Sequence, residues 1–410
     1  MTDAADKSPS SWHLSDIREL AQLLTQTLPA TVQITEAVHQ AVLSGMGIKG
    51  RDKGKTAGLT GLIYKGVHGA ANSLGSGING LLARLPLPTQ PSVAETPKRA
   101  ALLATLNGVL GDKLVEQQNA LATPMTLRYQ GKQLDWKDIP ADSPHTGRVL
   151  LMIHGLCMND LQWHTSYQGK SVNHGEAVAK ALGYLPLYLR YNSGLSIASN
   201  GQALALQLED LCDRWPGAIK QLSVLAYSMG GLVIRSACHY AQIHSLRWPK
   251  RLQHLIFLGT PHHGAPLESA GHWLEQLLPV TPYSMPFVKL TRIRSQGIRD
   301  LRHGKVIDAS RNSKELIIRR DPRQPLPLPS GVACFAIAGT TSAKRTLLAE
   351  RLIGDGLVPL RSALGLHRER AHQLDFPPEH TLIAYRTTHM ALLGSPEVGA
   401  QLLDWLDDAR

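Results

Sequence analysis

The 410-residue chain predicts an α/β fold in which a mostly parallel sheet has helices on both faces. From about Leu127 onwards, short apolar runs of strand length alternate with segments that have the periodicity of helices. The apolar runs are continuous and do not alternate with polar residues, which is typical of strands buried on both faces of a parallel sheet. Ligands of such sheets bind outside the carboxyl ends of the strands, so a functional site is expected at that edge.

The predicted strands and helices follow one another along the second part of the chain. Six strands are expected, at residues 148–154, 184–191, 221–227, 251–259, 332–339 and 381–386. Four helices are expected between or after them, at residues 172–182, 201–215, 230–243 and 397–409. We therefore assign residues 121–410 to one α/β domain.

Residues 1–120 are predicted to form an N-terminal helical region. Small residues recur there at steps of three and four: Gly66, Ala70, Ser73, Gly77 and Gly80. Such a stripe lets another helix approach closely and permits self-association of the chain. We favour a helix that packs on protein, and the alternative is an amphipathic helix that lies on lipid. A proline-rich break over residues 84–97 precedes a further helix at 98–117.

The basic surplus of the chain is concentrated in one segment. The formal net charge is +11, and residues 247–323 carry 14 basic and 6 acidic side chains. A basic chain can bind nucleic acid, but no basic patch interleaved with aromatic residues occurs, so we exclude nucleic acid as a partner. The surplus instead raises the question of how an anionic substrate or a membrane surface approaches this segment.

Cysteine usage and hydropathy indicate a reducing compartment. The cysteines are Cys157, Cys212, Cys238 and Cys334, and they form no CxxC pair, so neither a disulfide framework nor a zinc site is expected. The N-terminus lacks a basic region followed by an apolar run, and no apolar stretch reaches 18 residues, so neither a secretory signal nor a transmembrane helix is expected. We expect a cytoplasmic protein, with peripheral membrane contact as an open alternative.

Ser228 is the candidate nucleophile. It lies in QLSVLAYSMGGLVIRSACHYA, which predicts a strand, a tight turn and a helix with the serine at the turn. Gly230 and Gly231 allow the close approach of backbones that this turn needs. The turn raises the hydroxyl above the sheet edge and directs the first N–H of the helix at the reacting carbonyl.

A serine hydroxyl needs a base, and the base needs an acid that fixes its tautomer. When the serine occupies such a turn, the acid and then the histidine follow it in the chain. Asp355 comes after the predicted strand at 332–339, and His389 comes after the strand at 381–386. Both are therefore expected at the edge of the sheet that carries Ser228.

The loop after the first predicted strand is expected to complete the site. His154 and Gly155 close that strand, and the N–H of Leu156 is expected to point at the oxyanion that forms in the reaction. The neighbouring Cys157 is predicted to be a core thiol, because no nucleophile turn surrounds it. The adjacent histidines of GTPHHG, at 262 and 263, are predicted to shape the mouth of the site and not to bind metal, since no further ligand is evident.

Five of these motifs, VLLMIHGL, AYSMGG, LGTPHHGAPLE, GDGLVPLRSAL and TTHMALL, resemble serine lipases and esterases of the α/β-hydrolase superfamily. The likeness is to bacterial lipases with an A-x-S-x-G turn and to the deacylases of glycosylphosphatidylinositol inositol, and it covers about residues 125–410. It implies Ser228 as the nucleophile, His389 as the general acid and base, and Asp355 as the residue that orients His389. It also implies the backbone N–H groups of Leu156 and Met229 as the oxyanion hole.

Two positions depart from the common pattern of this superfamily. Tyr227 stands where many lipases have histidine, and Ala226 stands where most have glycine. Both departures are compatible with the fold, and both leave the substrate class open.

Residues 265–331 are predicted to contain a cap or lid over Ser228, because the connection is long for this fold. Its apolar residues would line an acyl site: Trp273, Leu274, Leu277, Leu278, Met285, Phe287 and Val288. Its basic residues include Arg292, Arg294, Arg299 and Arg302. We interpret these arginines as a solvated face, and an anion-binding strip is the alternative.

The sequence thus predicts a serine carboxylester hydrolase that acts on acyl or lipid-like esters through an acyl-enzyme intermediate, with activity on short to medium acyl chains. This mechanism requires no metal and no organic cofactor. Acyl transfer to an alcohol or amine by the same residues is one alternative. The other is a binding or scaffold protein that keeps the fold, and the intact serine, aspartate and histidine argue against it.

Overall fold

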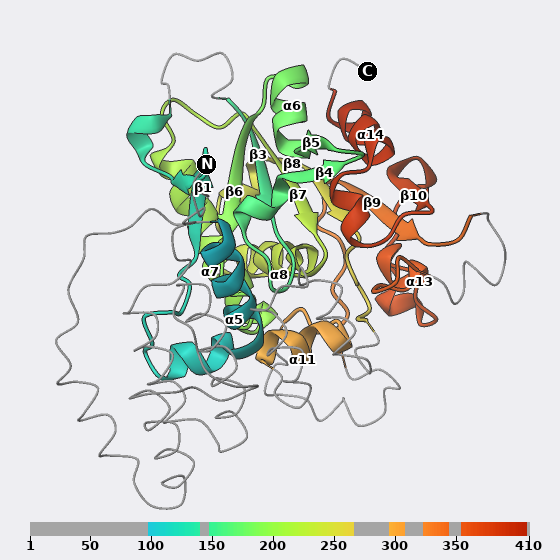
Figure 1. The fold of residues 1–410 in the computed structure, drawn as a ribbon, viewed down its shortest axis with the longest axis horizontal. Helices are drawn as coiled ribbons and strands as arrows, with labels where there is room; N and C mark the ends of the chain where they lie inside the picture. The colour runs from blue at the N-terminus through green and yellow to red at the C-terminus, as the bar shows by residue number, and fades with distance from the viewer. Residues whose placement is uncertain (1–96, 140–146, 266–294, 308–322, 344–353, 408–410) are drawn as a thin grey trace, which may run out of the picture.

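A computed structural model describes residues 97–139, 147–265, 295–307, 323–343 and 354–407 of the chain. Its main sheet has the strand order β10-β9-β8-β7-β3-β6-β1-β2 (Figure 1). The strands are β1 (Thr126–Tyr129), β2 (Lys132–Gln133), β3 (Arg148–Ile153), β6 (Leu185–Arg190), β7 (Gln221–Tyr227), β8 (Leu252–Leu258), β9 (Ala333–Thr340) and β10 (Thr381–Tyr385). A separate hairpin pairs β4 (Thr165–Tyr167) with β5 (Lys170–Val172).

The described helices are α5 (Pro97–Glu116), α6 (His174–Leu182), α7 (Ile197–Arg214), α8 (Met229–Ile243), α11 (Gln296–His303), α13 (Leu360–Ala363) and α14 (Pro396–Leu406). Short 3₁₀ turns are η2 (Trp136–Asp138), η3 (Asp160–Trp163), η4 (Trp248–Arg251), η7 (Arg370–His372), η8 (Pro378–His380) and η9 (Met390–Leu393). All five predicted helices that fall on described residues are present. Helix α7 begins four residues earlier than predicted, because the Ser196 side chain accepts the N–H of Ser199 at 3.0 Å and caps it.

The six predicted strands are present within one residue at either end, and they pair in parallel from β6 to β10. The hairpin of β1 and β2 extends this sheet in the antiparallel sense and was not predicted from the sequence. Its strands are short, and β1 is half-buried while β2 is exposed, so they lack a continuous apolar run. The turn residues Gln130 and Gly131 have φ of 48° and 76°, which is typical of a two-residue hairpin turn.

Two hydrophobic cores lie on opposite faces of the sheet. Alternate residues of β3 divide between them: Val149 and Leu151 face the core shared with α5, α7 and α8, whereas Leu150 and Met152 face the core shared with α6 and α14. Continuous apolar strands are therefore explained by burial on both faces. The strand order, the parallel pairing and the helices on both faces are those of an α/β-hydrolase fold, which confirms the predicted fold class.

The N-terminal region and the cap are described only in part. Helix α5 buries Leu106, Val109 and Leu114 in the same core as α7 and α8. Residues 1–96, with the small-residue stripe, lie outside the described residues, so the domain boundary near residue 120 stays a prediction. The predicted cap contributes α11 and residues 323–331, while its apolar residues between Trp273 and Val288 and also Arg292 and Arg294 lie outside the described part of the chain.

Candidate active site

Ser228 occupies a strained turn between β7 and α8. Its backbone has φ of 52° and ψ of −123°, a region that residues other than glycine rarely adopt. The Ser228 N–H donates to the carbonyl of Leu258 at 2.8 Å, which ties the turn to the end of β8. The hydroxyl oxygen is buried and has no hydrogen-bond partner among the described residues. Strain of this kind and an unpartnered buried hydroxyl are typical of a nucleophile turn.

The two glycines after Ser228 are required by close backbone contacts. A Cβ atom at Gly230 would lie 2.6 Å from the carbonyl oxygen of Ile153, at the end of β3. A Cβ atom at Gly231 would overlap the side chain of Thr260, just after β8. The start of α8 therefore sits directly against the two neighbouring strand ends, as the sequence predicted for this turn.

The loop after β3 packs on the Ser228 side chain. A Cβ atom at Gly155 would lie 3.0 Å from the Ser228 Cβ. The next residue, Leu156, and the first residue of α8, Met229, each have an N–H that donates no hydrogen bond to a described residue. The two residues predicted to supply the oxyanion donors therefore adjoin the same serine, Leu156 through Gly155 and Met229 as its chain neighbour.

His154 and Tyr191 stabilise the loop that follows β3. Their rings stack with centroids 4.3 Å apart, and the Tyr191 hydroxyl donates to the His154 carbonyl at 2.9 Å. The His154 Nδ1–H donates to the Gly155 carbonyl at 2.8 Å. Burial lowers the pKa of His154 to about 4, so the ring is neutral near pH 7. The part played by Tyr191 could not be predicted from the sequence, because this contact joins the residues that follow two different strands, β3 and β6.

Asp355 and His389 form a buried pair beside the serine turn. The His389 Nδ1–H donates to Asp355 Oδ2 at 2.6 Å, and each side chain is 1% exposed. Asp355 Oδ1 accepts the N–H groups of Leu357 at 3.0 Å and Val358 at 2.8 Å, which fixes the carboxylate in place. Because Nδ1 carries the proton, Nε2 of the neutral ring has the lone pair that a general base needs.

Tyr227 connects this pair to the turn of Ser228. Its ring centroid lies 4.8 Å from that of His389, and its hydroxyl donates to the His389 carbonyl at 3.1 Å. A Cβ atom at Gly259, which follows the Leu258 partner of Ser228, would lie 3.1 Å from His389 Cε1. All five residues predicted for the site, Ser228, Asp355, His389, Leu156 and Met229, therefore gather at the carboxyl ends of β3, β7, β8, β9 and β10.

Two further predictions concern residues around the site. Cys157 is 1% exposed within a hydrophobic core, and burial raises its pKa to about 12, so the prediction of a core thiol is confirmed. His262 was expected at the mouth of the site, and this was wrong. His262 is 2% exposed, and its ring packs edge-on to that of Phe257 with the ring centroids 4.7 Å apart, because the loop turns the side chain back towards the core. No group of three potential metal ligands occurs among the described residues.

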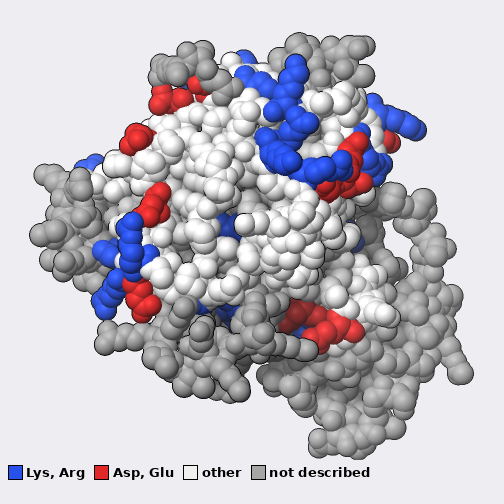
Figure 2. All heavy atoms as spheres, turned by 180° about the vertical axis from the view of Figure 1, so that it is seen from behind, with Lys and Arg blue, Asp and Glu red and all other residues white. Residues whose placement is uncertain are grey.

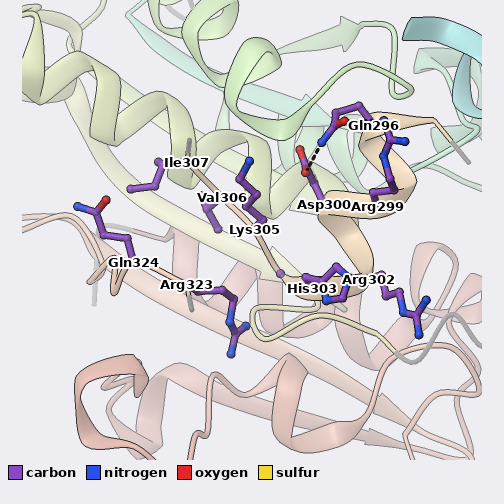
Figure 3. A pocket seen from close by; sticks show the side chains of 11 residues that line it. Gln296, Arg299, Asp300, Arg302, His303, Lys305, Val306, Ile307, Arg323 and Gln324 are labelled. Atoms are coloured by element: carbon purple, nitrogen blue, oxygen red, sulfur yellow. Dashed lines mark hydrogen bonds between the residues drawn. The ribbon is translucent and has the colours of Figure 1, made fainter. Parts of the chain in front are cut away.

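A basic cavity of about 620 Å³ lies between α11 and residues 323–324. Figure 3 shows that the charged groups of Arg299, Arg302, Lys305 and Arg323 lie at separate places around it and do not converge on one point. Arg299 also lies 3.9 Å from the carboxylate of Asp112. This arrangement favours the interpretation of Arg299 and Arg302 as a solvated face over the anion-binding strip.

On the face of the molecule opposite to the one seen in Figure 1, the charged side chains lie in separate groups. Figure 2 shows one group of basic side chains over the upper part of this face and a second at its left, each with acidic side chains beside it, and a largely uncharged surface between the two groups. A continuous basic surface of the kind that follows a nucleic acid backbone is not present on this face among the described residues. No helix in the described part of the chain has the length and hydropathy needed to cross a bilayer.

A domain family of unknown function, DUF7379, matches residues 116–287. No curated protein sequence matches the chain. Among solved structures, the chain is similar to the mature lipase BlEst2 of Bacillus licheniformis, with 16% identity and a TM-score of 0.40 over 66% of this chain and 94% of that one. A lipase-esterase related protein from Clostridium acetobutylicum gives 14% identity and a TM-score of 0.34 over 65% and 96% of the two chains.

The phospholipase PlaB of Legionella pneumophila is also similar, with 15% identity and a TM-score of 0.34 over 53% of this chain and 45% of that one. All three TM-scores lie below 0.5. The fold assignment therefore rests on the strand order and the serine turn of this chain itself.

Proposed function

We propose that the protein is a serine hydrolase that cleaves carboxylic esters through an acyl-enzyme intermediate. One observation carries the proposal: the buried 2.6 Å bond between His389 Nδ1 and Asp355 lies beside the strained turn of Ser228. A scaffold protein has no need of a strained, buried and unpartnered serine at this position, whereas a nucleophile does.

The reaction begins when Ser228 Oγ attacks the ester carbonyl carbon and His389 Nε2 takes the hydroxyl proton. The carbonyl oxygen becomes an oxyanion, which the N–H groups of Leu156 and Met229 stabilise. Asp355 orients His389 and stabilises the imidazolium. The tetrahedral intermediate then expels the alcohol, which receives the proton from His389, and leaves the acyl group on Ser228.

Water completes the cycle. His389 removes a proton from a water molecule that attacks the acyl-enzyme carbonyl, and it returns that proton to Ser228 Oγ when the carboxylic acid leaves. An alcohol or amine in place of the water would make the same site an acyltransferase. Product analysis with and without such acceptors separates hydrolysis from transfer.

A serine-directed fluorophosphonate tests the proposal directly. Wild type should be labelled, and Ser228→Ala should not. Ser236→Ala is the matched control, because Ser236 lies on the same helix and is also buried without a hydrogen-bond partner among the described residues. It should be labelled like wild type.

A chain-length series of p-nitrophenyl esters, extended to amides and phospholipids, then identifies the substrate class, with turnover expected on short to medium acyl esters. Wild type that is neither labelled nor able to cleave any ester would refute the proposal. Exclusive turnover of amides would refute the ester class.

A further inference from the structure

Helix α5 lies directly against the loop that carries Leu156. A Cβ atom at Gly108 would overlap the Cys157 sulfur and would lie 3.0 Å from both the Cα and the N atom of Cys157. Ordinary contacts of such an atom begin at 3.4 Å, so only glycine lets the helix backbone approach this loop so closely. The contact involves the residue that directly follows Leu156.

Cys157 is held in an unfavourable backbone conformation at this contact. Its φ is 58°, in the left-handed region that residues other than glycine rarely adopt. Its N–H donates to Ser193 Oγ at 3.0 Å. A strained residue persists only where its surroundings fix it, and here α5 and Ser193 enclose it.

Helix α5 also fixes the loop that contains Ser193. The Asn192 side chain donates to the Gly111 carbonyl at 3.0 Å, and a Cβ atom at Gly194 would overlap the Asn107 carbonyl oxygen. The same helix accepts the Ser295 hydroxyl at the Gly108 carbonyl at 2.7 Å, just before α11 begins. Helix α5 therefore contacts Cys157 itself and also the loop of Ser193, which accepts the Cys157 N–H.

We propose that α5 is a positioning element for the oxyanion hole, in which Gly108 and Cys157 form the contact that keeps the Leu156 N–H directed at the substrate oxygen. This inference rests on the proposed function of Ser228 and Leu156. Because a misplacement of about 1 Å in a reacting geometry can reduce rates by about 100-fold, the contact need only shift the loop slightly to affect the chemistry.

The variant Gly108→Ala, made in the full chain, tests whether α5 positions the Leu156 N–H. Its activity is measured on a pair of substrates that report on the oxyanion hole. The pair is a p-nitrophenyl ester and its thionoester, in which sulfur replaces the carbonyl oxygen. Sulfur is a weak hydrogen-bond acceptor, so an intact oxyanion hole favours the oxygen ester. We expect kcat for the oxygen ester to fall by about 10- to 100-fold with little change in KM, and the oxygen-to-sulfur rate ratio to fall by about tenfold.

Two controls separate positioning from loss of stability. Gly399→Ala makes the same substitution within α14, where the new atom would be in ordinary contact with His174 at 3.5 Å, so both rates and their ratio should stay at wild-type values. Leu402→Ala truncates a fully buried side chain of α14, so it should lower the melting temperature while the rate ratio stays unchanged.

A double variant tests the contact itself. In Gly108→Ala with Cys157→Ala, the added methyl group takes the space that the sulfur leaves, while its 3.0 Å contacts with the Cα and N atoms of residue 157 remain. The rate ratio should therefore recover in part towards the wild-type value. Cys157→Ala alone keeps Gly108 and should lower the ratio by a smaller factor than Gly108→Ala, which gives a second measurement if Gly108→Ala folds poorly.

A folded Gly108→Ala protein with the wild-type oxygen-to-sulfur rate ratio would overturn the inference, even if its overall rate were lower. A double variant whose rate ratio is no higher than that of Gly108→Ala would also overturn it. Wild type that neither cleaves the ester nor reacts with fluorophosphonate would instead overturn the proposed function, before any α5 variant is measured.

Discussion

Replacing Asp355 with asparagine should remove most of the activity while leaving the fold in place. In the native protein, Asp355 Oδ2 accepts the His389 Nδ1–H and Oδ1 accepts the N–H groups of Leu357 and Val358. In Asp355→Asn, the amide oxygen can keep the two backbone bonds, and the amide NH₂ group then faces His389 Nδ1. Two donors cannot bond each other, so the imidazole takes the tautomer with its proton on Nε2.

That tautomer cannot accept the Ser228 proton. A Ser-His-Asp site that holds its histidine in the wrong tautomer loses about 10⁴-fold in kcat, which corresponds to about 5.5 kcal/mol of transition-state stabilisation at 1.36 kcal/mol for each factor of ten. The loss in the free energy of unfolding should be far smaller, about 1 to 3 kcal/mol, because one buried hydrogen bond to a charged group is weakened.

The assay measures kcat on a p-nitrophenyl ester, the second-order rate of fluorophosphonate labelling, and the urea midpoint of unfolding. Asp375→Asn is the control, since this aspartate is 63% exposed and pairs with Arg370 at the surface, and it should behave as wild type in all three measurements. A loss of less than about tenfold in kcat for folded Asp355→Asn would refute the assignment of His389 as the base that Asp355 orients.

Three further outcomes follow from buried groups. Burial lowers the pKa of His154 and His263 to about 4 from the usual 6.5, so between pH 6.5 and 4 the unfolded chain binds protons that the folded chain does not. The free energy of unfolding should therefore fall as the pH is lowered through this window, by up to about 1.4 kcal/mol per pH unit for each histidine, and His263→Asn should reduce the slope measured by urea unfolding at several pH values. Asp160→Asn leaves Arg190 and Arg128 buried beside a neutral side chain, so the free energy of unfolding should fall by about 3 to 5 kcal/mol, whereas the exposed pair of Asp210 and Arg214 should tolerate Asp210→Asn. Gly231→Ala forces a methyl group onto Thr260 and should cost about 1 to 3 kcal/mol of stability by thermal unfolding, with Gly399→Ala as the tolerated comparison.

The residues of the candidate site were predictable because the strands that carry them are strongly patterned. Ser228 follows β7, whose seven residues are all buried, and Asp355 comes after β9, in which seven of the eight residues are buried. His389 comes after β10, which is mostly half-buried but has a largely apolar sequence, TLIAY. Once parallel strands were expected, their carboxyl ends had to meet at one edge, and this brought three distant residues together. The same argument could not find β1 and β2, because these strands are short, half-buried in β1 and exposed in β2, and have no such pattern.

The contacts between elements could not be predicted from the sequence, for a different reason. The periodicity of α5 predicts a helix, but its small residues at Gly108 and Gly111 are explained only by Cys157 and Asn192, which lie on two loops more than 40 residues away. A glycine inside a helix lowers helix propensity, so by itself it favours no particular partner. Only the packed structure shows what approaches it.

Tyr227 illustrates how a departure from a family pattern can be accommodated. In place of the histidine that many lipases have before the serine, the chain has a buried phenol, and burial raises its pKa well above the usual value, so it stays protonated. That proton is donated to the carbonyl of His389, while the ring packs against the imidazole of His389 and edge-on against Trp163. The residue next to Ser228 therefore fixes the loop of His389. A histidine is shorter than a tyrosine and could not reach the same carbonyl from this position, so the His389 loop and Tyr227 depend on each other in this chain.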